Sequence, residues 1–127
     1  MATLTKHLLS EIAAMSGRRF VVTSTMASAA NIFHEVPITP AGVLDECWVY
    51  AHNFGSSDVE CTFLWGLSTM PSTSGTDVYE GIDITIPFKS GRALVFDGVI
   101  MGHSLSAAAY AGVGSSISID GFVNRIT

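Results

Sequence analysis

The spacing of apolar residues changes once along the chain, near residue 18. Before that point, apolar residues recur at intervals of three or four: Leu4, Leu8, Ile12 and Met15. This interval is typical of an amphipathic helix, and Gly17 lies where a glycine is expected to end one. The sequence therefore predicts a short helix over residues 4–16, within an N-terminal arm of residues 1–17. A helix of this length is marginal in isolation, so we expect its apolar stripe to lie against the domain or a neighbouring chain.

From residue 18 onward the helical period disappears. Short runs of β-type residues alternate there with clusters rich in Gly, Pro, Ser and Asn. About eight such runs, spaced roughly ten residues apart, are typical of a sandwich or barrel. Residues 18–127 are therefore predicted to form one all-β domain, an antiparallel, jelly-roll-like β-sandwich of about eight strands. Within it, Asp97-Gly98 is a typical hairpin turn signal.

The segment Asn53-Phe54-Gly55-Ser56-Ser57 separates two long β-type runs, residues 43–52 and 59–66. We interpret it as a hairpin turn that pairs odd positions with odd positions, which gives the hairpin one apolar face. In this register Cys47 and Cys61 could be cross-strand neighbours, and a disulfide would be possible with Cα atoms within about 7 Å. We favour free thiols that pack as small core hydrophobes.

The opposite face of that predicted hairpin is mixed polar and aromatic. A sandwich strand needs only one buried face, so Trp48 and Tyr50 exceed what the core requires, and exposed aromatics anchor interfaces. The alternative is that a loop or the N-terminal helix covers this face. The candidate interface residues, taken from this face and from the N-terminal stripe, are Leu4, Leu8, Ile12, Met15, Trp48, Tyr50, His52 and Leu64.

The charge content points toward assembly. Charged residues make up 13% of the chain, about half the share typical of soluble domains, and interface centres are depleted of Lys, Glu and Asp. A monomer with a hydroxyl-rich surface is the alternative.

The net charge of the chain is −5, with six Lys and Arg in total. No basic stripe is therefore available to neutralise phosphates, and we expect no nucleic-acid partner. The chain has no long apolar run or polybasic patch, so no membrane association is expected either.

The pair Arg18-Arg19 faintly resembles a twin-arginine export signal. The apolar stretch after it is short and is interrupted by Thr23, Ser24 and Thr25. We therefore interpret the arginines as the opening of the first strand, and we expect no signal peptide.

The sequence offers no constellation typical of catalysis. Its four histidines, His7, His34, His52 and His103, form no pair at the spacing of two or four that a metal site on one element would use. No serine lies in a G-x-S-x-G elbow. We therefore expect no catalytic residues, no metal and no cofactor. A cupin-like metalloenzyme is a disfavoured alternative, because it would want two histidines two apart on a strand.

The order of turns and strands over residues 43–123 carries a resemblance. A strand, the Asn53–Ser57 turn, a strand ending at Trp65 and a Pro/Ser loop come first. They are followed by Ile84-Thr85-Ile86-Pro87, then by Leu94-Val95-Phe96-Asp97-Gly98, and finally by Ser116-Ile117-Ser118-Ile119-Asp120-Gly121-Phe122. This order resembles small β-sandwich structural proteins of tailed-bacteriophage particles.

The resemblance implies a non-catalytic virion protein. The leading expectation is a capsid decoration (cement) protein. Such proteins are commonly trimers, so the resemblance implies a homo-oligomer, most simply a homotrimer. It would bind the major capsid protein on the outer surface of the capsid and brace the junctions between capsomers. A tail or fibre component is the alternative within that family. A carbohydrate-binding module is another alternative, in which Trp48, Tyr50, Tyr79 or Tyr110 would stack on sugar rings.

Overall fold

The structure, a computed structural model, describes residues 2–9, 20–22, 32–38, 41–67 and 81–127. Within these residues the chain forms strands and no helix. The strands are β1 (Leu4–Leu8), β2 (Phe20–Val21), β3 (Ile32–Glu35), β4 (Leu44–Asn53), β5 (Val59–Leu67), β6 (Gly81–Ile86), β7 (Arg92–Gly102), β8 (Ser106–Ala111) and β9 (Ile117–Ile126). The all-β prediction is therefore confirmed for the described part of the chain.

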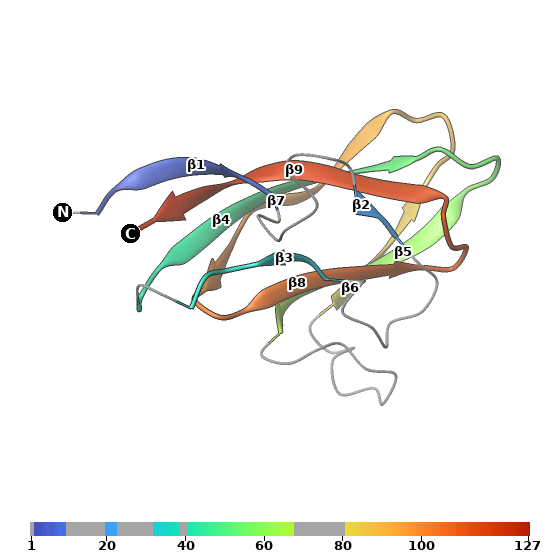
Figure 1. Cartoon of the computed structure of the whole chain (residues 1–127). Coiled ribbons are helices and arrows are strands. Elements are labelled where there is room, and N and C mark those ends of the chain that lie inside the picture. The colour runs from blue at the N-terminus through green and yellow to red at the C-terminus, as the bar shows by residue number, and fades with distance from the viewer. Residues whose placement is uncertain (1, 10–19, 23–31, 39–40, 68–80) are drawn as a thin grey trace.

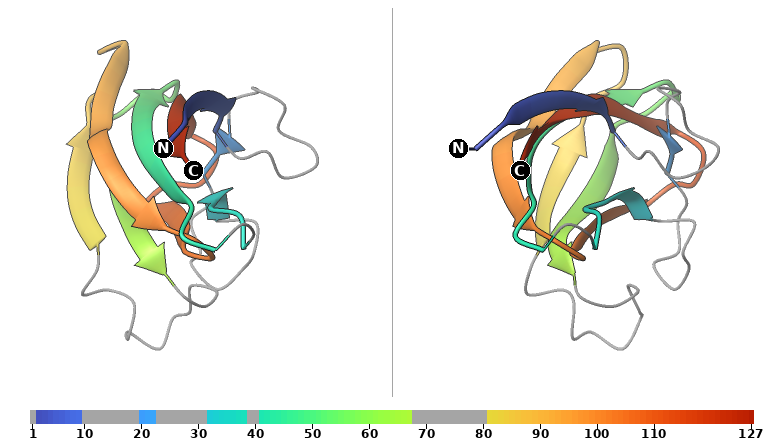
Figure 2. Two further views of the ribbon diagram at one scale, coloured as in Figure 1. Left: turned by 90° about the vertical axis from the view of Figure 1, so that its left-hand side faces the viewer. Right: turned by 60° about the vertical axis from the view of Figure 1, so that its left-hand side comes forward.

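The strands form two antiparallel sheets that lie one above the other (Figure 1). Sheet A has the order β1-β9-β4-β7, with β2 also paired to β9, and sheet B has the order β3-β8-β5-β6. The pairs are nested along the chain: β1 with β9, β3 with β8, β4 with β7 and β5 with β6. Successive nested pairs alternate between the two sheets. The turned views of Figure 2 show the chain wrapping around a central space that the core side chains fill.

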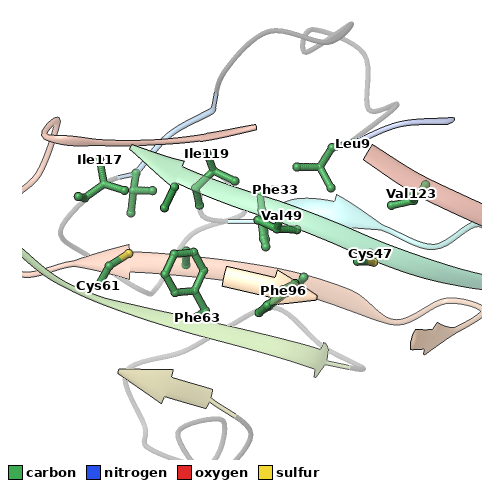
Figure 3. Close-up of a cluster of buried hydrophobic side chains, with 14 of the residues drawn as sticks. Leu9, Phe33, Cys47, Val49, Cys61, Phe63, Phe96, Ile117, Ile119 and Val123 are labelled. Carbon is green, nitrogen blue, oxygen red and sulfur yellow. The ribbon is translucent and has the colours of Figure 1, made fainter. Parts of the chain in front are cut away.

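The core lies between the sheets and follows from strict alternation along the strands. In β4 the odd positions are buried and the even ones are not, as the period of two in a strand requires. Phe33, Phe63 and Phe96 form the centre, with ring centroids 6.0–6.5 Å apart and tilted or edge-on contacts of the kind that aromatic rings prefer. Figure 3 shows these rings between the layers, beside Val49 and Cys61.

The helix predicted over residues 4–16 is wrong at its start. Residues 4–8 form β1, which pairs with β9 from Leu4↔Ile126 to Leu8↔Phe122. Two leucines four apart also lie on one face of a strand, so the sequence spacing fits both structures. The exposed edge of β9 offers backbone partners, which a marginal isolated helix cannot match. Residues 10–16 lie outside the described residues.

The hairpin predicted around Asn53–Ser57 is also wrong, because β4 belongs to sheet A and β5 to sheet B. The segment is a corner between the sheets. The Asn53 side chain holds it: Nδ2 donates to the carbonyl oxygens of Ser57 and Ile86, each at 2.8 Å, and Oδ1 accepts from the Gly55 amide at 2.9 Å. The facing directions predicted for the two strands remain correct, since odd positions of both point into the core.

The corner also determines where Cys47 and Cys61 lie, because it places β4 and β5 in different sheets. They lie on opposite sheets, and both point into the core. They are therefore not cross-strand neighbours, and both are free thiols, as predicted.

Candidate functional site

The outer face of sheet A carries most of the predicted interface residues. Strand register gives it outward-pointing side chains from four strands: Leu4, Lys6 and Leu8 of β1, Asp120, Phe122, Asn124 and Ile126 of β9, Leu44, Glu46, Trp48, Tyr50 and His52 of β4, and Arg92, Leu94, Asp97 and Ile100 of β7. This set is called the outer face below. It includes strands from both ends of the chain, which only the folded topology brings together.

Two aromatic rings form the centre of the outer face. Trp48 and Phe122 are directly paired across β4 and β9, with centroids 6.3 Å apart and planes 10° from parallel. Trp48 Nε1 donates a hydrogen bond to Glu46 Oε1 at 2.7 Å, and Asn124 Nδ2 donates to the same oxygen at 2.9 Å. These two hydrogen bonds lower the pKa of Glu46. The carboxylate therefore stays charged at neutral pH and fixes the indole.

A glycine on the next strand lets the indole lie against the sheet. Gly98 of β7 has φ +78°, and a Cβ there would lie 3.3 Å from Cζ2 of Trp48. Asp97-Gly98 is therefore not a hairpin turn, because β7 runs unbroken from Arg92 to Gly102. The pairing of β7 with β4 shifts at this point, between Cys47 and Trp48. The glycine serves the packing of Trp48.

Cations of the same chain cover the neighbouring rings. Lys6 Nζ lies 4.2 Å from the centroid of the Phe122 ring, and Arg92 Cζ lies 4.2 Å from that of Tyr50. Both distances are within the range of cation–π attraction. Arg92 also pairs with Asp120, with Nη2 2.6 Å from Oδ1. The aromatic centre is therefore held in place by its own neighbours.

Aliphatic side chains around this centre are open to solvent. The exposed fractions are 66% for Leu4, 50% for Leu8, 37% for Leu44, 47% for Leu94 and 57% for Ile100. Leu4, Ile126 and Leu44 are direct neighbours across three adjacent strands. Singly exposed apolar residues are normal on proteins, whereas a contiguous apolar group such as Leu4, Ile126 and Leu44 is a candidate interaction site.

The predicted interface residues are only partly brought together. Leu4, Leu8, Trp48, Tyr50 and His52 share the outer face, whereas Ile12 and Met15 lie outside the described residues. Leu64 lies elsewhere: it is fully buried on sheet B, clustered with Ala108, Ile32 and Tyr110. Its assignment to the Trp48 face is wrong, because that assignment assumed a β4–β5 hairpin.

Sequence reasoning missed several residues of the outer face. Leu44 has the same parity as Trp48 on one strand, so alternation alone could have found it. Leu94, Ile100, Phe122 and Ile126 needed the strand order, which alternation does not give.

A buried ion cluster closes one end of the core. Asp45 of β4, 0% exposed, accepts hydrogen bonds from Arg125 Nε at 2.8 Å and from Arg125 Nη2 at 2.9 Å. His34 Nε2 of β3 lies 2.8 Å from Asp45 Oδ2. Burial raises the pKa of Asp45, but the hydrogen bonds and charges of Arg125 and His34 outweigh burial and bring that pKa to about 2. The cluster joins the two sheets, since β3 is in sheet B.

The cysteine thiols are inert at neutral pH. Burial raises the pKa of both Cys47 and Cys61 to about 12, and the nearby Asp45 charge adds to the effect at Cys47. The thiolate is the nucleophile and the metal ligand, and it is not populated here. Among the described residues, no three His, Cys, Asp or Glu side chains gather as they would to hold a metal ion. The same residues contain no helix long and apolar enough to cross a membrane.

Comparison of the chain with protein-family models, with curated proteins and with solved structures found no match.

Proposed function

We propose that this chain is a non-catalytic structural subunit of a virion, a capsid decoration (cement) protein. It binds the outer surface of the capsid through the outer face of sheet A and braces the junctions between capsomers. The observation that carries the proposal is the outer face itself, where exposed Leu4, Leu44 and Ile100 lie around an aromatic pair fixed in place.

The fold supports this class of protein. We infer that the sandwich is a jelly roll, because its four nested antiparallel pairs alternate between two sheets. Jelly rolls recur in viral capsid proteins, in lectins and in cupins. Fold alone does not decide among these functions, so the assignment depends on the outer face.

Rigidity makes the outer face suited to docking. Glu46 and Gly98 position Trp48, and Lys6 lies on Phe122. A surface that is already ordered loses less conformational entropy on binding, and aromatic anchors contribute much of the energy of interfaces. A homotrimer would present three such faces to the shell, and linked contacts raise avidity without strengthening any single contact.

A carbohydrate-binding function is the second candidate. The nearly parallel rings of Trp48 and Phe122 favour it, because sugars stack on flat aromatic surfaces. However, Lys6 and Arg92 lie over the Phe122 and Tyr50 rings. A sugar would have to displace these cations before it could stack there. The docking function needs no such rearrangement, so we rank it first.

The proposal is tested with empty capsid shells of the virus whose genome encodes the chain. Wild-type chain is expected to co-sediment with the shells. The double variant Leu44→Asp with Ile100→Asp places carboxylates among the exposed aliphatics, and unpaired charges buried at an interface are costly. We expect its affinity to fall by about 100-fold or more.

The matched control is Ile38→Asp with Val113→Asp, which also replaces exposed aliphatics, 72% and 54% exposed, but in loops outside the outer face. This control should bind the shells as the wild type does. Failure of the wild-type chain to bind shells would refute the decoration function. Binding to a glycan array that is lost in Trp48→Ala, without any capsid binding, would support the second candidate.

A further inference from the structure

Strands β1 and β2 lie end to end along one edge of β9. β1 pairs with residues 122–126 of β9, and β2 pairs Phe20 with Ile119 and Val21 with Ser118. Both strands run antiparallel to β9. Residues 9–19 connect them along the chain, and ten of these, residues 10–19, follow the buried Leu9. β1 is therefore the terminal edge strand of sheet A, as Figure 1 shows at the blue end of the chain.

β1 is attached through its backbone ladder and through side chains that stay near the surface, such as Lys6 on the Phe122 ring. None of the five side chains of this strand is fully buried, and Leu4 and Leu8 are 66% and 50% exposed. Its ladder to β9 is extended by Thr3 and Thr127, whose amides donate to each other's carbonyl oxygens at 2.8 and 2.9 Å. Beyond the strand, Leu9 enters the core at 7% exposed. A second copy of the chain offers the same partners at the same positions.

The connection has length to spare. The ends of β1 and β2 face Phe122 and Ile119, three residues apart on β9, which is a distance of roughly 10 Å. Ten linking residues can extend to roughly 33–36 Å. The chain length alone therefore allows β1 to reach β9 of an adjacent copy.

We infer that β1 is an exchange arm that links copies of this chain. β1 of one copy pairs with β9 of its neighbour, and its Leu9 fills the equivalent core position there. Every contact of the closed form is remade, so exchange between identical chains has a low cost. The closed form keeps the advantage in dilute solution, because a tethered strand has an effective concentration near the millimolar range.

The inference deepens the proposed function, because an assembly on a shell holds copies at such local concentrations. Exchange would then interlock neighbouring subunits on the shell. Because every contact is remade, Leu4 and Leu8 would keep the neighbours and the exposure that they have in the closed form, now on the outer face of the adjacent copy.

The test is a pair of double-cysteine variants that share one position. Ile126 of β9 lies between Leu4 on one side and Leu44 on the other. Leu4 and Ile126 form a pair without direct hydrogen bonds, since the adjacent Thr3 and Thr127 form the hydrogen-bonded pair, and the Cα atoms of such pairs are about 4.5 Å apart. Both neighbours of Ile126 are within reach of a disulfide.

Variant Leu4→Cys/Ile126→Cys and control Leu44→Cys/Ile126→Cys are equilibrated in a thiol redox buffer from about 0.05 to 5 mM, which spans the expected effective concentration. Free thiols are then alkylated, and the products are separated by denaturing, non-reducing electrophoresis. We expect the first variant to change from cross-linked monomer to cross-linked dimer as concentration rises. The control should remain monomer, because β4 and β9 lie within one body. The single variants Leu4→Cys and Ile126→Cys measure dimers formed by chance collision.

Cross-linked monomer at every concentration, or a dimer yield no higher than that of the single variants, would overturn the exchange. Either result would leave shell binding through the outer face untouched, because shell binding is measured with the wild-type chain. Conversely, exchange observed in solution without shell binding would refute only the decoration function.

Discussion

Asp45 carries its charge inside the sandwich, bonded to both Arg125 and His34. Its pKa falls from 3.8 to about 2 in the folded chain. A lowered pKa means that the stabilisation is fully present above pH 3.8 and is lost as the pH falls through 2. We expect the free energy of unfolding to decrease by about 2 kcal/mol from this carboxyl alone over that interval. Urea unfolding curves at a series of acidic pH values measure the loss.

The variant Asp45→Asn is the control for this acid-induced loss. It removes the titrating group, so its stability should depend less on pH between 4 and 2. At neutral pH it should be less stable than the wild type by about 3–5 kcal/mol, because the buried Arg125 charge loses the Asp45 carboxylate. Glu60→Gln, at an exposed position of β5, should change stability by less than about 0.5 kcal/mol. An unchanged pH dependence in Asp45→Asn would contradict the assignment.

Gly121 is a position where the fold excludes any side chain. Its φ is +151°, and a Cβ there would collide with the backbone carbonyl oxygen of Trp48 on β4. We expect Gly121→Ala to lower the free energy of unfolding by about 3 kcal/mol through strain and forced separation of the strands. Thermal or urea unfolding measures the change.

Gly112→Ala is the matched comparison for Gly121→Ala. A Cβ at Gly112 would meet its nearest atom, the Glu60 carbonyl oxygen, at 3.7 Å, an ordinary contact. Its stability should therefore stay the same or rise by up to about 1 kcal/mol. Equal losses in the two variants would show that glycine at position 121 has no special role.

The sequence predicts correctly whether a side chain points into the core or outward where strand alternation alone decides it. The odd positions of β4 and β5 point inward and Trp48, Tyr50 and His52 point outward, as the period of two requires. Alternation predicted the wrong environment for Leu64. It has outward parity on β5 but is fully buried, because Ile32 and Tyr110 of other strands pack against its side of sheet B. Such a cover depends on non-local packing that parity cannot reveal.

At the scale of elements, Asn53 joins the end of β4 to the corner and to β6. Its side chain forms hydrogen bonds with Ser57 and Gly55 of the corner and with Ile86 of β6. The side chain is 2% exposed, so water cannot replace these bonds. We expect Asn53→Ala to lower the free energy of unfolding by about 3 kcal/mol, from three lost hydrogen bonds and the polar groups left unsatisfied. Ser56→Ala, at an exposed position of the same corner, should change it by less than about 0.5 kcal/mol. A similar loss in both variants would mean that the corner is not held through Asn53.

Elements were mispredicted where one local signal fits two structures. The Leu4–Leu8 spacing suits a helix face and a strand face equally, and the choice was made by β9, more than a hundred residues away in sequence. The Asn53–Ser57 segment contains residues typical of a hairpin, yet β4 takes both partners, β7 and β9, from later in the chain. Gly98 suggested a turn, but it serves the ring of Trp48.

At the scale of the whole molecule, the sequence predicted two packed layers and an apolar interior, because many short alternating runs leave few other ways to bury one face of each. It could not predict which strands are neighbours. The nested pairing joins the two ends of the chain, β1 to β9, around all the other pairs. The outer face, built from β1, β4, β7 and β9, is a product of that pairing. A candidate site of this kind is visible only after folding.

Apart from the exchangeable β1, we expect the nested pairs β3–β8, β4–β7 and β5–β6 to open as one unit, and the two cysteines can report it. Cys47 and Cys61 point into one core from opposite sheets (Figure 3), and burial raises the pKa of each thiol to about 12. We expect both to react with a thiol reagent at least about 1000-fold more slowly in the native chain than in denaturant, since a stable domain opens only rarely. Because one opening event exposes both thiols, their labelling rates should differ little and should rise together as urea is added.

The variant Leu4→Cys is the control for reagent activity. Position 4 is 66% exposed, so the new thiol should react without delay. Rapid labelling of one native cysteine alone would mean that the layers separate locally. The nested pairs would then not act as a single cooperative structure.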